Sequence, residues 1–463
     1  MKASNLFKNF AAKALLMLMA IAFVSCSDDT NEGNGGDNGG GGDQDIPEGA
    51  IPIGGVVDQD LTLESGNVYW LGENLIVTEG HDLNVEPGVT VIADPTNVPE
   101  IVARGNFYAW GTQEEPILFT VPDEFKTDNN IYGAVWGGIM GGETTEEMAM
   151  TYVTVEYSGG PANANSEAVR LGKLDVGELL YSVFFNNNQG KLYMENSTVA
   201  HSGGDAIYVE RGQVELFHNV VAYTGVTEDE AFNFKQGTTG DCAFNLMYSI
   251  ATNGIKIGFS KPIEGDPQTN VNMYNNTMAF CGWRRDGERG GSINIEKGAR
   301  GKIFNNLVVN GKYGTKVDAS SDLNNTWVGH NYYYGEVDDS KSTGYVPHHG
   351  ILPNREEPTA GDEMFWEVFN AACNVFDGQD ILGRDDVEDP LFVNFDVDHP
   401  TNPNGEPSLE LDYKTLDFSL RSDSPAANIG TTDIEPNAVF TEIGGKTITI
   451  PSPAEYAGAY APK

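Results

Sequence analysis

The feature that most constrains this fold is a short strand pattern that recurs through the middle of the chain. In each copy apolar and polar residues alternate over about five positions, so one side of the strand would face a core and the other solvent. The four clearest copies are 206–210, 231–235, 254–258 and 292–296. Strands this short, with few Asn-Gly hairpin turns between them, predict a solenoid whose coils pair in parallel.

An asparagine recurs at one turn of each expected coil, just before a short apolar segment. The series is Asn196, Asn219, Asn245, Asn276 and Asn306. A carboxamide can donate and accept hydrogen bonds, so stacked asparagines can form a ladder that satisfies turn amides otherwise buried without partners. We therefore expect a structural role for these asparagines.

Several motifs resemble those of right-handed parallel β-helix lipoproteins of the Bacteroidota type, in the polysaccharide-lyase-like β-helix superfamily. They include Glu86-Pro-Gly-Val-Thr-Val91, Trp136-Gly-Gly-Ile139, Asp389-Pro-Leu-Phe-Val-Asn394 and Ser424-Pro-Ala-Ala427. The resemblance implies an all-β fold, a right-handed parallel β-helix. It says little about activity, because this superfamily contains lyases, hydrolases, adhesins and proteins of no known activity.

We expect the β-helix coils to occupy 51–330 and its C-terminal coils 386–463. Between them, 331–385 reads as an insertion with one short amphipathic helix. Residues 362–373 carry Met364, Phe365, Val368, Phe369 and Ala372 on one helical face. Such a helix would cover the flank or end of the solenoid, or form a functional lid.

The N-terminus reads as a bacterial lipoprotein signal. Residues 1–25 combine lysines with an apolar core, and Ser25 precedes Cys26. The resemblance implies cleavage before Cys26 and acylation of that cysteine. Residues 27–32 are polar and acidic, similar to a surface-export signal, and the Gly/Asp-rich remainder of 26–50 predicts a flexible tether. We expect a lipid-anchored protein of the outer membrane or cell surface.

The formal net charge of −41 makes nucleic acid a poor partner. Beyond Cys26 the chain has only Cys242, Cys281 and Cys373, an odd number that implies no disulfide framework. We expect no cofactor other than calcium, which the acidic clusters at 385–389 and 396–399 could bind, although neither matches an EF-hand loop.

Aligning the four repeated strands predicts two outward columns of side chains. With Ile207, Phe232, Ile255 and Ile293 facing the core, one column contains Tyr208, Asn233, Lys256 and Asn294, and the next Glu210, Lys235, Gly258 and Glu296. Such side chains can stack on sugar rings and pair with hydroxyls or uronate carboxylates, whereas alternating charges can also serve solubility alone. We take this as the candidate ligand face.

A second candidate is the loop Trp283-Arg284-Arg285-Asp286-Gly287-Glu288-Arg289. Guanidinium groups bind carboxylates bidentately and an indole can stack on a sugar, although local pairing of the arginines with Asp286 and Glu288 is an alternative. The resemblance to β-helix lyases implies Lys235 or Lys256 as the base that removes a proton beside a uronate, with Arg284 or Arg285 binding the carboxylate.

We predict a non-catalytic surface protein that binds glycans or another extracellular ligand on a β-helix face. The first alternative is a polysaccharide lyase-like enzyme acting on uronate-containing glycans. The second is a structural or adhesive surface protein, for which removal of those side chains would change nothing. No nucleophile elbow, phosphate loop or dinucleotide fingerprint occurs in the sequence.

Overall fold

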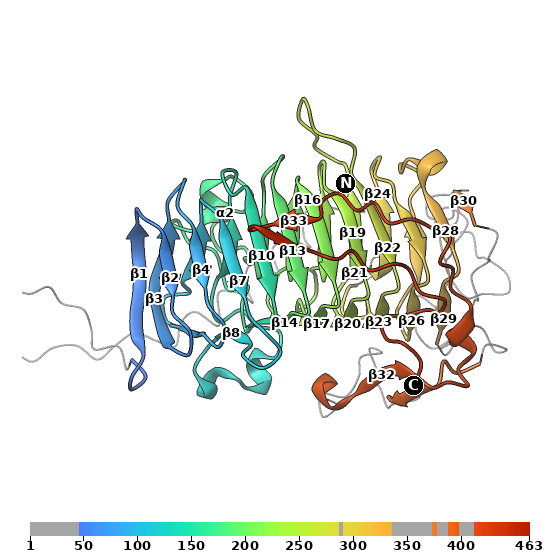
Figure 1. Ribbon diagram of the computed structural model, residues 1–463, viewed down its shortest axis with the longest axis horizontal. Coiled ribbons are helices and arrows are strands. Elements are labelled where there is room, and N and C mark those ends of the chain that lie inside the picture. Colours follow the sequence, from blue (N-terminus) through green and yellow to red (C-terminus); the bar gives the residue numbers. More distant parts are fainter. Residues whose placement is uncertain (1–45, 287–289, 336–372, 377–387, 398–411) are drawn as a thin grey trace, which may run out of the picture. The chain divides into compact units, whose positions relative to one another are not determined.

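The computed structural model describes residues 46–286, 290–335, 373–376, 388–397 and 412–463. Residues 1–45 lie outside this description, and so do the predicted signal, Cys26 and nearly all of the predicted tether and of the predicted helix at 362–373. In the described unit, parallel strands stack coil upon coil as an all-β parallel β-helix (Figure 1). The fold class predicted from the sequence is confirmed.

Three parallel stacks of strands form the faces of the helix, here called faces 1, 2 and 3. Face 1 comprises β1 (Ile51–Val57), β3 (Val68–Val77), β6 (Glu100–Ala103), β9 (Gly138–Gly141), β12 (Val183–Phe185), β15 (Ile207–Glu210), β18 (Phe232–Lys235), β21 (Asn253–Gly258), β24 (Gly291–Glu296) and β27 (Thr315–Val317).

Face 2 begins in the first halves of β1 and β3 and continues through β5 (Thr90–Ala93), β8 (Ile117–Thr120), β11 (Val153–Glu156), β14 (Thr198–Ser202), β17 (Val220–Thr224), β20 (Leu246–Ile250), β23 (Thr277–Cys281), β26 (Leu307–Val309) and β29 (Tyr332–Tyr334).

Face 3 comprises β2 (Leu61–Leu63), β4 (Leu83–Val85), β7 (Phe107–Trp110), β10 (Glu147–Thr151), β13 (Lys191–Glu195), β16 (Gln213–Phe217), β19 (Thr239–Ala243), β22 (Asn270–Tyr274), β25 (Lys302–Phe304), β28 (Trp327–Gly329) and β30 (Asn374–Val375).

The core fills the space between the three faces. Inward residues of the four repeated strands are fully buried, as their alternation predicts: Ile207, Val209, Phe232, Phe234, Ile255, Ile257, Ile293 and Ile295. Burying such side chains contributes about 1.5–3 kcal/mol each. One hydrophobic cluster of this kind runs from the first coil to Tyr333 in β29.

The asparagine ladder exists, shifted by one member. Asn219, Asn245, Asn276, Asn306 and Asn331 stack so that each Nδ2 donates to the next Oδ1 at 2.9–3.1 Å. Each Oδ1 also accepts the backbone N–H of the preceding coil. Asn196 is not a member, because the backbone N–H of Ser197 makes the contact to Asn219 Oδ1.

The described C-terminal part does not add the coils expected at 386–463. Instead β31 (Phe392–Asn394) pairs antiparallel with β32 (Asp417–Leu420), and β33 (Glu442–Ile443) with β34 (Lys446–Thr447). This part also holds the 3-10 turns η4 (Tyr413–Thr415) and η5 (Pro425–Asn428). A short strand with alternating apolar and polar residues can form a further coil or an outer strap, meaning a segment that packs on the outside of the helix. In both cases one apolar side of the strand is buried.

Two C-terminal segments cover the outside of faces 2 and 3. Aromatic residues of 392–420 pack on outward side chains of face 2, including Tyr223 and Tyr248. Residues 434–450 pack on outward side chains of face 3, including Phe217 and Tyr274, and run along that face in Figure 1 (red). The outward hydrophobic side chains of faces 2 and 3 thus form the surface on which these segments pack.

A third cover lies on the early coils of face 1. Residues 162–181 contain the helix α2 (Glu167–Arg170), and they pack on Val102, Met140 and Phe184. Three further 3-10 turns, η1 (Asp123–Phe125), η2 (Asp128–Asn130) and η3 (Leu323–Asn325), lie in loops between strands. Among the described residues, no helix is long and apolar enough to cross a bilayer.

Candidate ligand-binding face

The outward side of β18, β21 and β24 differs from the rest of the helix surface. The hydrophobic clusters formed by the described residues cover faces 2 and 3 and the early coils of face 1, and they end at Tyr208. Beyond that residue the outward side chains of face 1 are polar. A ligand would therefore meet a row of polar side chains on this part of face 1.

The predicted columns match the observed strand register. Tyr208 is opposite Asn233, which is opposite Lys256, which in turn is opposite Asn294. The second column runs from Glu210 to Lys235 and from Gly258 to Glu296. Parallel strands lie about 4.8 Å apart, so the side chains in each column are direct neighbours.

A third column, which was not predicted from the sequence, lies where these strands begin. It contains Asp205 and Glu230, in the turns before β15 and β18, and Asn253, the first residue of β21; all three are buried. The Asn233 Nδ2 donates to Asp205 Oδ2 at 2.8 Å and to Glu230 Oε2 at 3.1 Å. Asn253 Nδ2 donates to Glu230 Oε1 at 3.0 Å. Two carboxyl groups therefore lie directly beside the central column.

These acids differ in protonation because their surroundings differ. Burial and the nearby Glu230 raise the pKa of Asp205 well above its usual range. The pKa of Glu230 is lowered to about 2, because the attraction of Lys256 and Lys235 and its hydrogen bonds outweigh the opposing effect of burial. Glu230 is thus the ionised member and Asp205 the neutral one.

Lys256 is held between two carboxylates. Its Nζ lies 3.3 Å from Glu230 Oε1 and 3.8 Å from Glu296 Oε1. These acids outweigh the effect of burial and raise its pKa. Glu296 also contacts Lys297 Nζ at 3.2 Å and accepts a hydrogen bond from Asn294 Nδ2 at 3.3 Å. Lys256 therefore stays protonated and is a poor general base.

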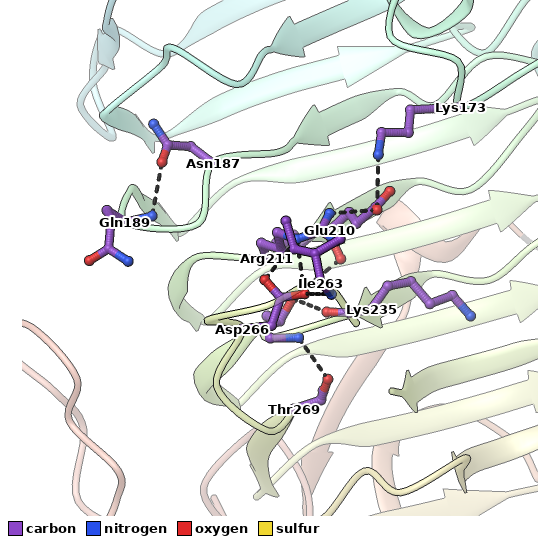
Figure 2. Close-up of polar contacts among 12 residues, drawn as sticks. Lys173, Asn187, Gln189, Glu210, Arg211, Lys235, Ile263, Asp266 and Thr269 are labelled. Atoms are coloured by element: carbon purple, nitrogen blue, oxygen red, sulfur yellow. Dashed lines mark hydrogen bonds and ion pairs between the residues drawn. The ribbon is translucent and has the colours of Figure 1, made fainter. Parts of the chain in front are cut away.

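Lys235 has a different environment. No described acid lies within ion-pair distance of its Nζ, and in Figure 2 its side chain extends away from the neighbouring ion pairs. Burial and the positive charge of Lys256 lower its pKa to about 8. The ammonium group of Lys235 is thus the cation of this face that is left for a ligand.

Three carbonyl oxygens on the same face also lack partners. The Oδ1 atoms of Asn233, Asn253 and Asn294 are buried, and no described residue donates a hydrogen bond to them. Their side chains are at most 5 % exposed. A buried acceptor without a donor costs about 1–3 kcal/mol, so a hydrogen bond from water or from a ligand that reaches these oxygens would remove that cost.

Ion pairs fix one edge of the face, as Figure 2 shows. Arg211 Nη1 lies 2.7 Å from Glu210 Oε1, and Arg211 Nε lies 2.9 Å from Asp266 Oδ1. Lys173, from the segment that covers the early coils, binds Glu210 Oε1 at 2.9 Å. These contacts attach the loop around Asp266 and the early cover to the ends of the strands.

An aromatic pair closes the other side of the face toward the early coils. Tyr208 is partly exposed and stacks on Tyr181, with ring centroids 4.3 Å apart and an interplanar angle of 16°. Phe184 lies behind Tyr208 at 6.0 Å. The polar patch therefore begins directly beside a tyrosine ring, and aromatic rings provide stacking surfaces for the apolar faces of sugars.

The architecture agrees with the comparison to known families. The model of the pectate-lyase-like β-helix domain matches residues 55–338. The chain belongs to this family. No curated protein and no solved structure matches it.

Within this pectate-lyase-like β-helix, only some residues of the predicted arginine loop lie toward face 1. Arg284 donates to the carbonyls of Thr224, Gly225 and Ser249, on the face 2 side, and its guanidinium lies 4.1 Å from the centre of the Tyr132 ring. These contacts do not support its predicted role in binding a ligand carboxylate. They give it a structural role in the loop.

The two neighbours of Arg284 also make internal contacts. Arg285 pairs with Glu228, in the turn before β18. Burial and the charges of Glu230 and Glu228 raise the pKa of Asp229 to about 7, and the charge of Arg285 opposes this shift. Trp283 Nε1 donates to the Asn310 carbonyl at 2.7 Å. Arg285 is thus the member of the predicted loop that lies beside the acidic turn column.

Among the described residues, no group of three or more His, Cys, Asp or Glu side chains is arranged to hold a metal ion. The acidic cluster at 385–389 lies mostly outside the described residues, and so does part of 396–399. Calcium binding therefore stays a prediction. Cys242 and Cys281 are buried free thiols.

Proposed function

We propose that the β-helix binds an acidic polysaccharide on the outward side of β18, β21 and β24, without cleaving it. The observation that carries this proposal is the group of unpaired atoms on one face: three amide oxygens and the Lys235 ammonium. Sugar hydroxyls supply donors to the oxygens, and a uronate carboxylate supplies the anion for Lys235. Tyr208 supplies the stacking surface beside them.

Electrostatics support an acidic ligand although the chain is strongly acidic. On this face Asp205 is neutral. Glu230 and Glu296 are ionised, and the positive charges of Lys256 and Lys297 balance their negative charges. Lys235 adds a positive charge, and no acid of the described residues lies within ion-pair distance of it. The patch is therefore locally cationic, and burial strengthens its attraction for a carboxylate.

The experiment is isothermal titration of the soluble chain, residues 27–463, with oligogalacturonate of defined length and with a neutral oligosaccharide of the same length. We expect preferential binding of the acidic ligand. Replacement of Lys235 by Met or of Asn233 by Ala should weaken it at least tenfold, since each removes a direct contact. Equal affinity of these variants and the parent chain would refute the proposal.

A lyase activity is the alternative, and the lowered pKa of Lys235 favours it. A base with a pKa of about 8 is deprotonated in a useful fraction at neutral pH, whereas the ion-paired Lys256 is not. The two functions respond oppositely to pH: carboxylate binding by Lys235 weakens above pH 8, whereas proton abstraction quickens. Formation of unsaturated uronate products, with and without calcium, tests the alternative.

We also propose that Cys26 carries a lipid that anchors the protein in the outer membrane, so that the binding face meets extracellular glycans. The support is the N-terminal sequence pattern alone. Replacement of Cys26 by Ser should release the protein from the membrane fraction. Unchanged membrane association of that variant would contradict the anchor.

A further inference from the structure

A second recess lies at the other end of face 1, on the far side of the segment that covers the early coils. It is an open cleft of about 680 Å³, a size typical of small-ligand sites. Its lining comes from the first two strands of face 1, from Asn97 and from residues 163–170. The cover on Val102, Met140 and Phe184 separates it from the polar patch described above.

The sequence shapes the floor of this cleft through a bulge in β1. The pairing of β1 with β3 shifts between Ile53 and Gly55. A Cβ atom at Gly54 would come within 2.5 Å of Glu73 Cγ, so a larger residue there would displace the Glu73 side chain. Beyond the bulge, Val56 pairs with Ile76, and Val56 is 69 % exposed. The floor is therefore apolar and accessible.

The wall is built from carboxamides held by their own backbone. Asn165 N–H donates to Asn163 Oδ1 at 2.8 Å, and Asn74 Nδ2 contacts the Asn165 carbonyl at 3.4 Å. No described residue hydrogen-bonds the side-chain amide of Asn165 or the carboxylate of Glu73. Donors and acceptors thus project into a cleft with an apolar floor.

We infer that this cleft binds a neutral saccharide. A sugar presents hydroxyls that match amide and carboxylate groups, and a C–H face that matches Val56 and Ile76. Arg170, the cation of the described lining, shares Glu167 with Arg104, so one positive charge remains. The nearby carboxylate of Glu73 offsets that charge, so the lining has no net positive charge to favour a uronate. The two recesses therefore select different sugars, neutral in the cleft and acidic in the polar patch.

The test is titration of the soluble chain, residues 27–463, with neutral hexasaccharides of glucan, mannan and xylan. We expect at least one to bind, with affinity falling about tenfold or more in Asn165→Ala and in Glu73→Gln. Neither side chain supports the fold through a hydrogen bond to a described residue, so both variants should fold, which circular dichroism checks.

A matched control separates this inference from the proposed function. Lys235→Met, in the polar patch, should leave neutral-sugar binding unchanged, whereas Val56→Trp should block it by filling the floor. Binding that is insensitive to Asn165→Ala and Glu73→Gln, or no binding of any neutral hexasaccharide, overturns the inference. Loss of neutral-sugar binding in Lys235→Met would place that ligand in the polar patch instead and also overturn it.

Discussion

Lys235 and Lys256 lie one strand apart on the same face, and we expect their replacement by methionine to have opposite effects on stability. Lys235 has no acid within ion-pair distance among the described residues, and its pKa falls from 10.5 to about 8. Each pKa unit corresponds to about 1.36 kcal/mol. Since the side chain is only partly buried, we expect Lys235→Met to stabilise the fold by on the order of 1–3 kcal/mol at pH 7.

The pH dependence of this difference follows from the direction of the shift. The folded pKa of Lys235 is below the unfolded one, so the folded state binds fewer protons between about pH 8 and 10.5. The parent chain therefore gains stability from this group as pH rises through that window. The advantage of Lys235→Met should be full below pH 8 and vanish toward pH 10.5.

Lys256→Met is the matched control. Lys256 neutralises Glu230 at 3.3 Å, and the Glu230 side chain is only 9 % exposed. Leaving a buried carboxylate without its cation costs about 3–5 kcal/mol. Urea unfolding of both variants and the parent chain at pH 7 and pH 10, followed by fluorescence and circular dichroism, measures these differences. Destabilisation by Lys235→Met at pH 7 would refute the assignment of Lys235 as the unpaired cation.

Three further outcomes test the fold around the site. Asn276→Ala should lower the free energy of unfolding by about 2–4 kcal/mol, because the buried N–H of Asn245 loses its acceptor. Asn165→Ala should change the free energy of unfolding by less than about 0.5 kcal/mol, and urea titration compares the two variants. Asp241→Ala should speed hydrogen exchange at 437–440, since its carboxyl accepts backbone N–H groups of that segment at 2.7 and 3.0 Å; unchanged exchange would show that the contacts do not hold it. Cys242 and Cys281 should resist a thiol reagent in the folded protein and react in urea, because burial raises the pKa of both.

The central columns of the binding face could be predicted because a strand has a fixed period of two. Once Ile207, Phe232, Ile255 and Ile293 are assigned to the core, the intervening residues must face outward in register. The turn column could not be found this way. Asp205 and Glu230 precede their strands, where the period does not apply, and only the register observed between coils places them beside Asn233.

Contacts between segments that are distant in the sequence could not be predicted either. The backbone path of the loop at 283–286 decides that Arg284 binds carbonyls on the face 2 side, and nothing in the local pattern encodes that path. The same holds for the C-terminal segment, because the alternating pattern of its strands is compatible with both a further coil and an outer strap. The aromatic column outside faces 2 and 3, Tyr248 and Phe217 among it, favours the strap.

Along face 1 the outward column changes character at one point, and this change argues against a purely structural role. Ile76, Val102, Met140 and Phe184 are apolar and lie under or beside the early cover, whereas the positions from Asn233 onward are polar. A solenoid selected only for stability could continue the apolar column under its cover. Instead it keeps three buried amide oxygens unpaired, at about 1–3 kcal/mol each, beside a lysine with a lowered pKa. Unpaired buried polar atoms also occur elsewhere among the described residues, so the change from an apolar to a polar outward column is the observation that favours a ligand on this face.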